Sequence, residues 1–170
     1  MKPHDLDYCG RMAVNGATSY CLLAGLMNME IPPFYDEVHD LALRLVNSQD
    51  ETKSYWQLYE KLRMLCENHA DSEKDHPFQW ETLADFTLDD VAALEIYAKA
   101  LGIADILGLE QYSASIQLAM AERYLRLGEL ENAFNFASCA NEIAKITNDL
   151  ELRKEISEFL MEICGNKSLS

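Results

Sequence analysis

The chain has 170 residues, the size of one ordinary domain, and can bury enough surface to fold without disulfides or a structural metal. Hydrophobic residues make up 49% and charged residues 25%, which excludes a wholly disordered chain. The 29 acidic residues outnumber the 14 basic ones, giving a net charge of −15. That charge argues against nucleic-acid binding and against an anionic membrane surface. It fits either plain solubility or a basic protein partner.

The cysteines indicate the compartment. Five are widely spaced and form no Cys-x-x-Cys pair: Cys9, Cys21, Cys66, Cys139 and Cys164. This usage is typical of free thiols in a reducing environment, so we expect a cytoplasmic protein. The apolar stretch 17–29 resembles the core of a signal peptide, but acidic residues precede it and it is too short to span a bilayer. We interpret it as part of a buried helix.

In the first half of the chain, apolar residues recur at helical spacing and strand-like alternation is missing. A first helix is expected over 12–28, stopped by Pro32-Pro33. A second is expected from Pro33 to Val46. The pattern Ser48-x-x-Glu51 predicts a capping box for a third helix, which fades near His69. The polar stretch 70–78 then predicts a loop.

The second half predicts a short helical piece followed by four longer helices. The short piece covers about 80–86, and Thr87 is the expected N-cap of the next helix. The four longer helices are expected over 88–107, 110–127, 129–147 and 150–164. Three glycines mark expected helix ends: Gly108, Gly128 and Gly165.

An internal repeat appears when the chain is compared with itself at an offset of 40 residues. The stretch 93–106 (ALEIYAKALGIADI) then matches 133–146 (AFNFASCANEIAKI). The identical pairs are Ala93/Ala133, Ala100/Ala140, Ile103/Ile143, Ala104/Ala144 and Ile106/Ile146. Small residues in this pattern let neighbouring helices approach closely, as in helical repeat proteins.

The stretch 115–146 resembles a tetratricopeptide repeat of the long-helix type. The resemblance rests on small and aromatic residues at the family's positions: Ala121, Tyr124, Leu127-Gly128, Ala133 and Ala140. The sequence departs from the family at Gln117, Ala137 and Lys145. In size and charge the chain is also similar to repeat-type chaperones of bacterial type III secretion, although no diagnostic motif supports that likeness.

These patterns predict an all-α fold of about seven helices in antiparallel pairs, a tetratricopeptide-like helical repeat or α-solenoid. We expect a single helical domain over 1–170. Residues 1–80 would form degenerate repeats or a cap, and residues 81–165 the tetratricopeptide-like pairs.

Residues that could carry chemistry are sparse. Cys66, His69 and His76 lie close enough in sequence for half a zinc site, but a second ligand pair is missing. Motifs for nucleophilic catalysis or phosphate binding are absent from the sequence. We therefore expect neither enzyme activity nor a cofactor nor a bound metal. The predicted function is a protein-interaction module such as an adaptor, chaperone or regulator. Two alternatives stay open: an acidic inhibitor, immunity protein or DNA mimic, and a small metal-dependent enzyme using the loop 66–76.

Two groups of residues are candidates for partner contact. In the family that the repeat resembles, the first helix of each pair lines a groove, which implies a partner-binding face of five residues: Ser115, Leu118, Glu122, Leu125 and Arg126. The other interpretation is that Leu118 and Leu125 pack against a neighbouring helix. The aromatic group Tyr55, Trp56 and Tyr59 is similarly either core or an interface anchor.

Overall fold

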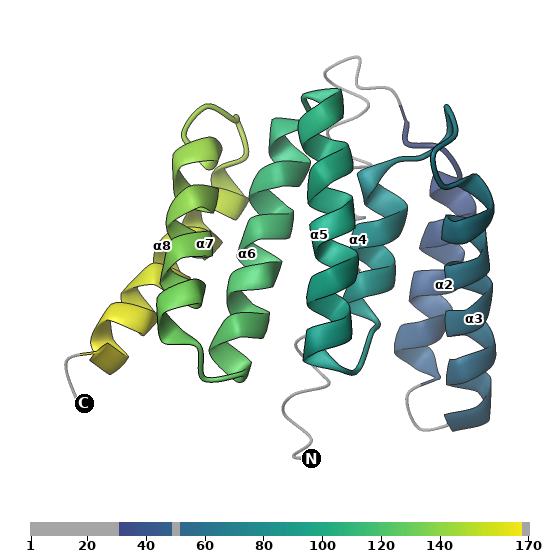
Figure 1. The fold of residues 1–170 in the computed structure, drawn as a ribbon, viewed down its shortest axis with the longest axis horizontal. Helices are drawn as coiled ribbons and strands as arrows, with labels where there is room; N and C mark the ends of the chain where they lie inside the picture. The colour runs from purple at the N-terminus through teal and green to yellow at the C-terminus, as the bar shows by residue number, and fades with distance from the viewer. Residues whose placement is uncertain (1–30, 49–51, 168–170) are drawn as a thin grey trace. The chain divides into compact units, whose positions relative to one another are not determined.

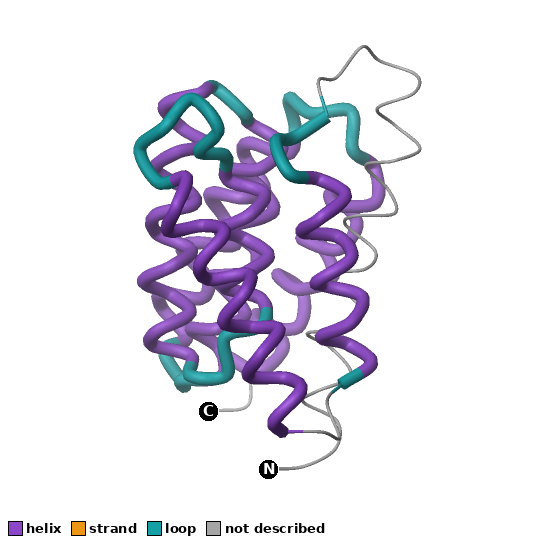
Figure 2. The backbone as a smooth tube through the Cα atoms, turned by 90° about the vertical axis from the view of Figure 1, so that its right-hand side faces the viewer, coloured by secondary structure: helices purple, strands orange, loops and turns teal. Residues whose placement is uncertain are grey.

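The computed structural model describes residues 31–48 and 52–167 (Figure 1). Within this part of the chain there are seven helices and no strand, so the predicted all-α fold is confirmed. Figure 2 shows loops and turns between consecutive helices wherever the connecting residues are described. The helix expected over 12–28 lies outside the described residues. The chain divides into two compact units, Met1–Thr87 and Leu88–Ser170.

The first unit contains α2 (Tyr35–Asn47), α3 (Thr52–His69) and α4 (Pro77–Asp85), which pack against one another. Helix α2 buries one apolar stripe with the predicted spacing of three and four residues. Aromatic and aliphatic side chains of α3 and α4 complete this core. Its fully buried large side chains include Val38, Leu45, Leu62, Cys66 and Leu83.

Two helix starts of the first unit differ from those predicted. Helix α2 begins at Tyr35, because Phe34 takes a left-handed backbone with φ of 59°. Ser48 ends α2, where its hydroxyl donates to the Leu45 carbonyl oxygen at 3.2 Å, and the rest of the capping box predicted for α3, residues 49–51, lies outside the described residues. Helix α4 begins at Pro77 rather than near residue 80, because the ring of His76 accepts a hydrogen bond from the Phe78 amide at 3.2 Å.

The second unit contains α5 (Asp90–Leu107), α6 (Glu110–Arg126), α7 (Leu130–Ala144) and α8 (Leu150–Lys167). Each helix packs against the next along the chain. The predicted N-cap Thr87 is wrong: Asp89 caps α5, its carboxylate accepting from the Ala92 amide at 2.8 Å. The Thr87 hydroxyl instead donates to the Leu83 carbonyl oxygen at 2.8 Å.

Glycines end two of these helices but not the last. Gly108 and Gly128 have φ of 65° and 79°, the left-handed conformation in which glycine carries no side-chain penalty. Helix α8, predicted to stop at Gly165, continues to Lys167. Gly165 has a helical environment open to solvent, and a single glycine costs a helix only about 1 kcal/mol.

The offset-40 repeat has a structural counterpart in α5 and α7. Each matched pair shares the same degree of burial. Ala93/Ala133, Ala100/Ala140 and Ala104/Ala144 are fully buried, Ile103/Ile143 are half-buried and Ile106/Ile146 are exposed. The two helices therefore present the same faces to their neighbours, as successive units of a helical repeat do.

Helices α6, α7 and α8 share one hydrophobic core. The small residues of α6 and α7 leave room for larger side chains of α8, namely Leu152, Ile156, Phe159 and Ile163. The rings of Tyr124 and Phe136 stack beside this core with centroids 5.2 Å apart. Large side chains on α8 thus pack against the small residues of α6 and α7.

Candidate partner-binding surface

The five predicted groove residues on α6 do not share one environment. Leu118 is only 2% exposed and belongs to the core of α6, α7 and α8, and Leu125 is half-buried against the same core. Glu122 is buried, while Ser115 is half-buried and donates to the Tyr112 carbonyl oxygen at 3.2 Å.

Leu118 lies where the packing interpretation places it. Of the two interpretations of this leucine, packing is the one that the structure shows, because a side chain in the core cannot also touch a partner. The apolar stripe of α6 is needed inside the unit, since the alanines of α7 present too little bulk to fill the space alone. A role in binding for the other four residues stays a prediction.

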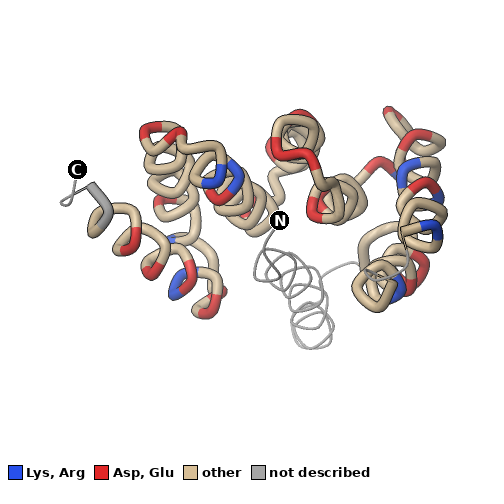
Figure 3. Tube along the Cα trace, turned by 90° about the horizontal axis from the view of Figure 1, so that it is seen from below, with Lys and Arg blue, Asp and Glu red and all other residues tan. Residues whose placement is uncertain are grey.

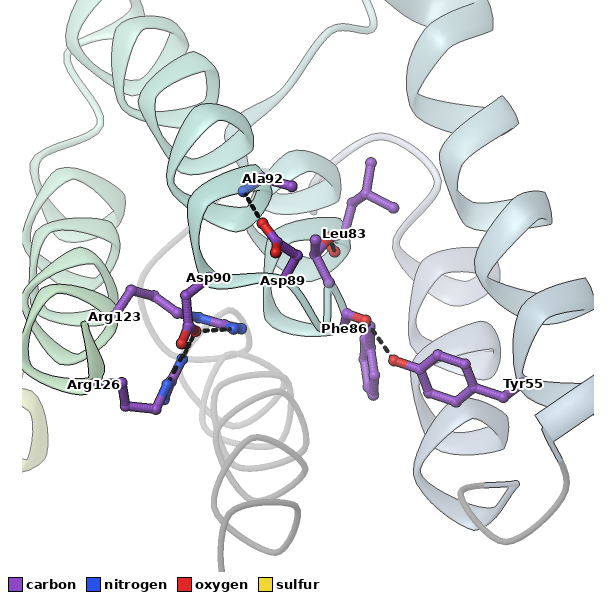
Figure 4. A network of polar contacts seen from close by, with 9 residues as sticks. Tyr55, Leu83, Phe86, Asp89, Asp90, Ala92, Arg123 and Arg126 are labelled. Carbon is purple, nitrogen blue, oxygen red and sulfur yellow. Dashed lines mark hydrogen bonds and ion pairs between the residues drawn. The ribbon is translucent and has the colours of Figure 1, made fainter. Parts of the chain in front are cut away.

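The fifth groove residue, Arg126, forms part of an ion cluster that the sequence did not predict (Figure 4). Asp90, in the first turn of α5, accepts hydrogen bonds from Arg123 at 2.9 Å and from two nitrogens of Arg126 at 3.0 and 2.8 Å. Arg123 is buried, and its guanidinium also lies 5.8 Å from the ring centroid of Tyr97. The cluster fastens the start of α5 to the end of α6.

Two opposing effects act on the Asp90 carboxyl. Burial alone would raise its pKa, but hydrogen bonds and charge from Arg126 and Arg123 outweigh burial and hold the pKa of Asp90 below its usual value. Asp90 therefore stays ionised throughout the neutral range. With both arginines occupied by this carboxylate, the cluster acts as a structural clamp between α5 and α6.

The loop between α3 and α4 does not assemble the metal site considered above. In the part of the chain that the structure describes, no three His, Cys, Asp or Glu side chains gather closely enough to hold a metal ion. The buried Cys66 thiol donates to the Gln79 carbonyl oxygen at 3.3 Å. His76 caps α4, and its burial lowers its pKa to about 4. Asp75 accepts from the Trp80 indole at 2.6 Å.

The aromatic group on α3 is divided between core and surface. Tyr55 is buried and donates to the Phe86 carbonyl oxygen, and Tyr59 shares a hydrogen bond of 2.9 Å with the Thr87 hydroxyl. Trp56 is about half exposed, with its ring edge-to-face against both tyrosines at centroid distances of 5.7 and 5.6 Å. Two residues of the group thus hold the first unit together, while the third presents an ordered aromatic ring to solvent.

Several large apolar side chains of the second unit are also exposed. They are Leu88, Val91, Ile106, Leu107, Leu127, Ile146, Leu150 and Met161. Along the chain, acidic positions (red) are spread over the helices and outnumber basic positions (blue) (Figure 3). Exposed apolar side chains that form a contiguous patch with a polar rim mark protein-binding surfaces.

Comparison with known proteins adds no family to this description. No family model matches the sequence, and neither a curated protein nor a solved structure matches it significantly. Among the described residues, none of the helices is both long enough and apolar enough to cross a membrane.

Proposed function

We propose that the chain is a non-enzymatic protein-interaction module: an adaptor, chaperone or regulator built on a tetratricopeptide-like helical repeat. The observation that carries this proposal is the matched burial of the repeat-related residues in α5 and α7. Such helices bury one face against their neighbours and leave the opposite face and the helix ends exposed. Repeats of this architecture act by presenting extended surfaces.

The exposed side chains and the charge indicate the class of partner. A net charge of −15 favours a basic peptide, helix or protein over nucleic acid or an anionic membrane. Cys66, Cys139 and Cys164 form no disulfide with one another among the described residues, which supports a reducing compartment, and we place the protein in the cytoplasm.

The alternative function, an acidic inhibitor or DNA mimic, would use the same negative charge but bind its partner in a different way. Its binding would be carried by the charge itself, so affinity would fall steeply with added salt. An interaction module that uses its exposed apolar side chains would keep most of its affinity. A metal-dependent enzyme finds less support, because Cys66 and His76 already have structural roles.

The proposal is tested by affinity capture of the full chain from its native cell, with quantitative mass spectrometry. The matched control is Ala137→Asp, which places a charge in the core of α6, α7 and α8 and should unfold the second unit. We expect a stoichiometric protein partner with the natural chain and none with the variant. Equal recovery with both chains, or stoichiometric zinc by elemental analysis, would contradict the proposal.

A further inference from the structure

One end of the second unit gathers exposed apolar side chains. Helices α5 and α7 finish there and α6 and α8 begin there, at the top of the α5 to α8 helices in Figure 1. Four large side chains at this end are more than half exposed: Ile106 at 86%, Leu107 at 51%, Ile146 at 66% and Leu150 at 72%. We call these four residues the apolar end. A single exposed leucine needs no explanation, but four large exposed apolar side chains at the same end of neighbouring helices call for one.

The apolar end is held in place by its own hydrogen bonds. The Gln111 amide donates to the Asp149 carboxylate at 3.0 Å, which ties the start of α6 to the turn between α7 and α8. The Ser113 hydroxyl donates to the Asp105 carboxylate at 2.8 Å, which ties α6 to the end of α5. A partner would therefore meet an ordered surface and pay little conformational entropy to bind it.

Acidic residues are frequent next to the apolar end in the sequence. Asp105, Asp149 and Glu151 directly adjoin its members, and Glu110 lies three residues after Leu107. Three cations lie nearby in the chain: Lys145 is paired with Glu142 at 2.5 Å, Lys154 with Glu158 at 3.7 Å, and Arg153 is in the first turn of α8. A second copy of this chain would bring the same carboxylates and a net charge of −15 against the surface. Like-charge repulsion disfavours self-association here, and a basic partner is favoured.

We propose that the apolar end binds a basic amphipathic helix of a partner protein, an inference that rests on the proposed function. Helix α6 packs against both α5 and α7, so at usual spacings of about 8–10 Å the axes of α5 and α7 lie at most roughly 20 Å apart. A helix rises about 1.5 Å per residue, so one of about 14 residues spans both. Its leucines would rest on Ile106 and Ile146, and its lysines would face the surrounding carboxylates.

The probe is a fluorescent synthetic peptide of about 14 residues, with leucines on one helical face and lysines elsewhere. Two matched peptides carry serine in place of leucine, or glutamate in place of lysine. Fluorescence anisotropy with the full chain measures each affinity. We expect the leucine–lysine peptide to bind at least tenfold more tightly than either control.

The site is assigned by two pairs of variants of the full chain. Ile106→Ser with Ile146→Ser should weaken the leucine–lysine peptide roughly tenfold or more. The matched control, Leu88→Ser with Val91→Ser, alters two similarly exposed residues at the other end of α5 and should leave its affinity unchanged. If the first pair melts earlier than the natural chain, Leu150→Ser alone provides the same test, with the same expected loss.

Three outcomes would overturn the inference. They are equal binding by both variant pairs, binding by the serine peptide as tight as by the leucine peptide, and self-association of the natural chain that the Ile106 and Ile146 changes abolish. A cellular partner captured equally well by the Ile106/Ile146 variant would overturn this site but leave the proposed function standing. Absence of any captured partner would contradict the proposed function itself.

Discussion

Replacing Leu118 by alanine distinguishes a core residue from a groove residue. The substitution removes three carbon atoms, worth about 2.4 kcal/mol at roughly 0.8 kcal/mol per buried carbon. The surrounding helices close only part of the resulting cavity, so the total loss of unfolding free energy is about 2–5 kcal/mol. For a unit of this size each kcal/mol lowers Tm by about 4–8 °C, so we expect a fall of at least about 8 °C.

Differential scanning calorimetry of the full chain measures this fall. Leu150→Ala is the matched control, because Leu150 is mostly exposed and its truncation should change Tm by less than about 2 °C. Leu125→Ala, at a half-buried position, should fall between the two. Equal Tm values for the Leu118→Ala and Leu150→Ala proteins would contradict the packing interpretation. If Leu118→Ala also lost partner capture, the groove interpretation would be favoured.

Three further predictions concern the polar contacts. Arg123→Ala should lower the free energy of unfolding by about 1–3 kcal/mol at neutral pH. This loss is smaller than that expected for breaking a wholly buried ion pair, because Asp90 is partly exposed, and the loss for Arg126→Ala should be smaller still. The pKa of Asp90 is lowered in the folded state, so the stabilisation by the Asp90–Arg123 ion pair is present at neutral pH and disappears as pH falls through that lowered pKa. Urea unfolding that shows the same loss of stability for Arg123→Ala at pH 3 and at pH 7 would contradict this prediction. The pKa of His76 falls from 6.5 to about 4 on folding, so the natural chain should lose stability as pH falls between these values, whereas His76→Asn, which keeps a capping acceptor, should not. Tyr55→Phe leaves the Phe86 carbonyl oxygen without its tyrosine donor and should cost about 1 kcal/mol in urea unfolding, and a cost near zero would show that this contact adds nothing.

Local patterns in the sequence predicted most of the second unit. Ala93 and Ala133 recur at an offset of 40 residues, and small residues at helical spacing indicated closely packed helices. Gly108 and Gly128 end α5 and α6 as predicted, because a left-handed residue after a helix favours glycine. Helix spacing and helix ends depend on residues close together in the chain, so they can be predicted from the sequence.

Competition between neighbouring residues explains the wrong N-cap of α5. Thr87 and Asp89 are both good N-caps two residues apart, and only Asp89 accepts the hydrogen bond from the Ala92 amide. The sequence pattern identifies residues able to cap a helix, while the path of the chain decides which of them does so.

Contacts between distant residues were beyond the sequence patterns. Asp90 and Arg123 are separated by 33 positions, and no periodicity links a residue in the first turn of α5 to one on α6. A weak sign was available, because Arg123 lies three residues after the buried Met120 and so near the buried face of α6. Leu118 was ambiguous for the same reason: its spacing placed it on one face, but only the packing of α6 with α7 and α8 shows that this face is inside.

Native mass spectrometry of the chain, isolated gently from its own cell, tests most directly whether it is a protein-interaction module. The chain alone weighs 19.3 kDa. We expect a complex of higher mass that releases this chain and one different protein in a fixed ratio when activated. A free chain at 19.3 kDa, or one carrying only bound metal or a small molecule, would contradict the proposed function.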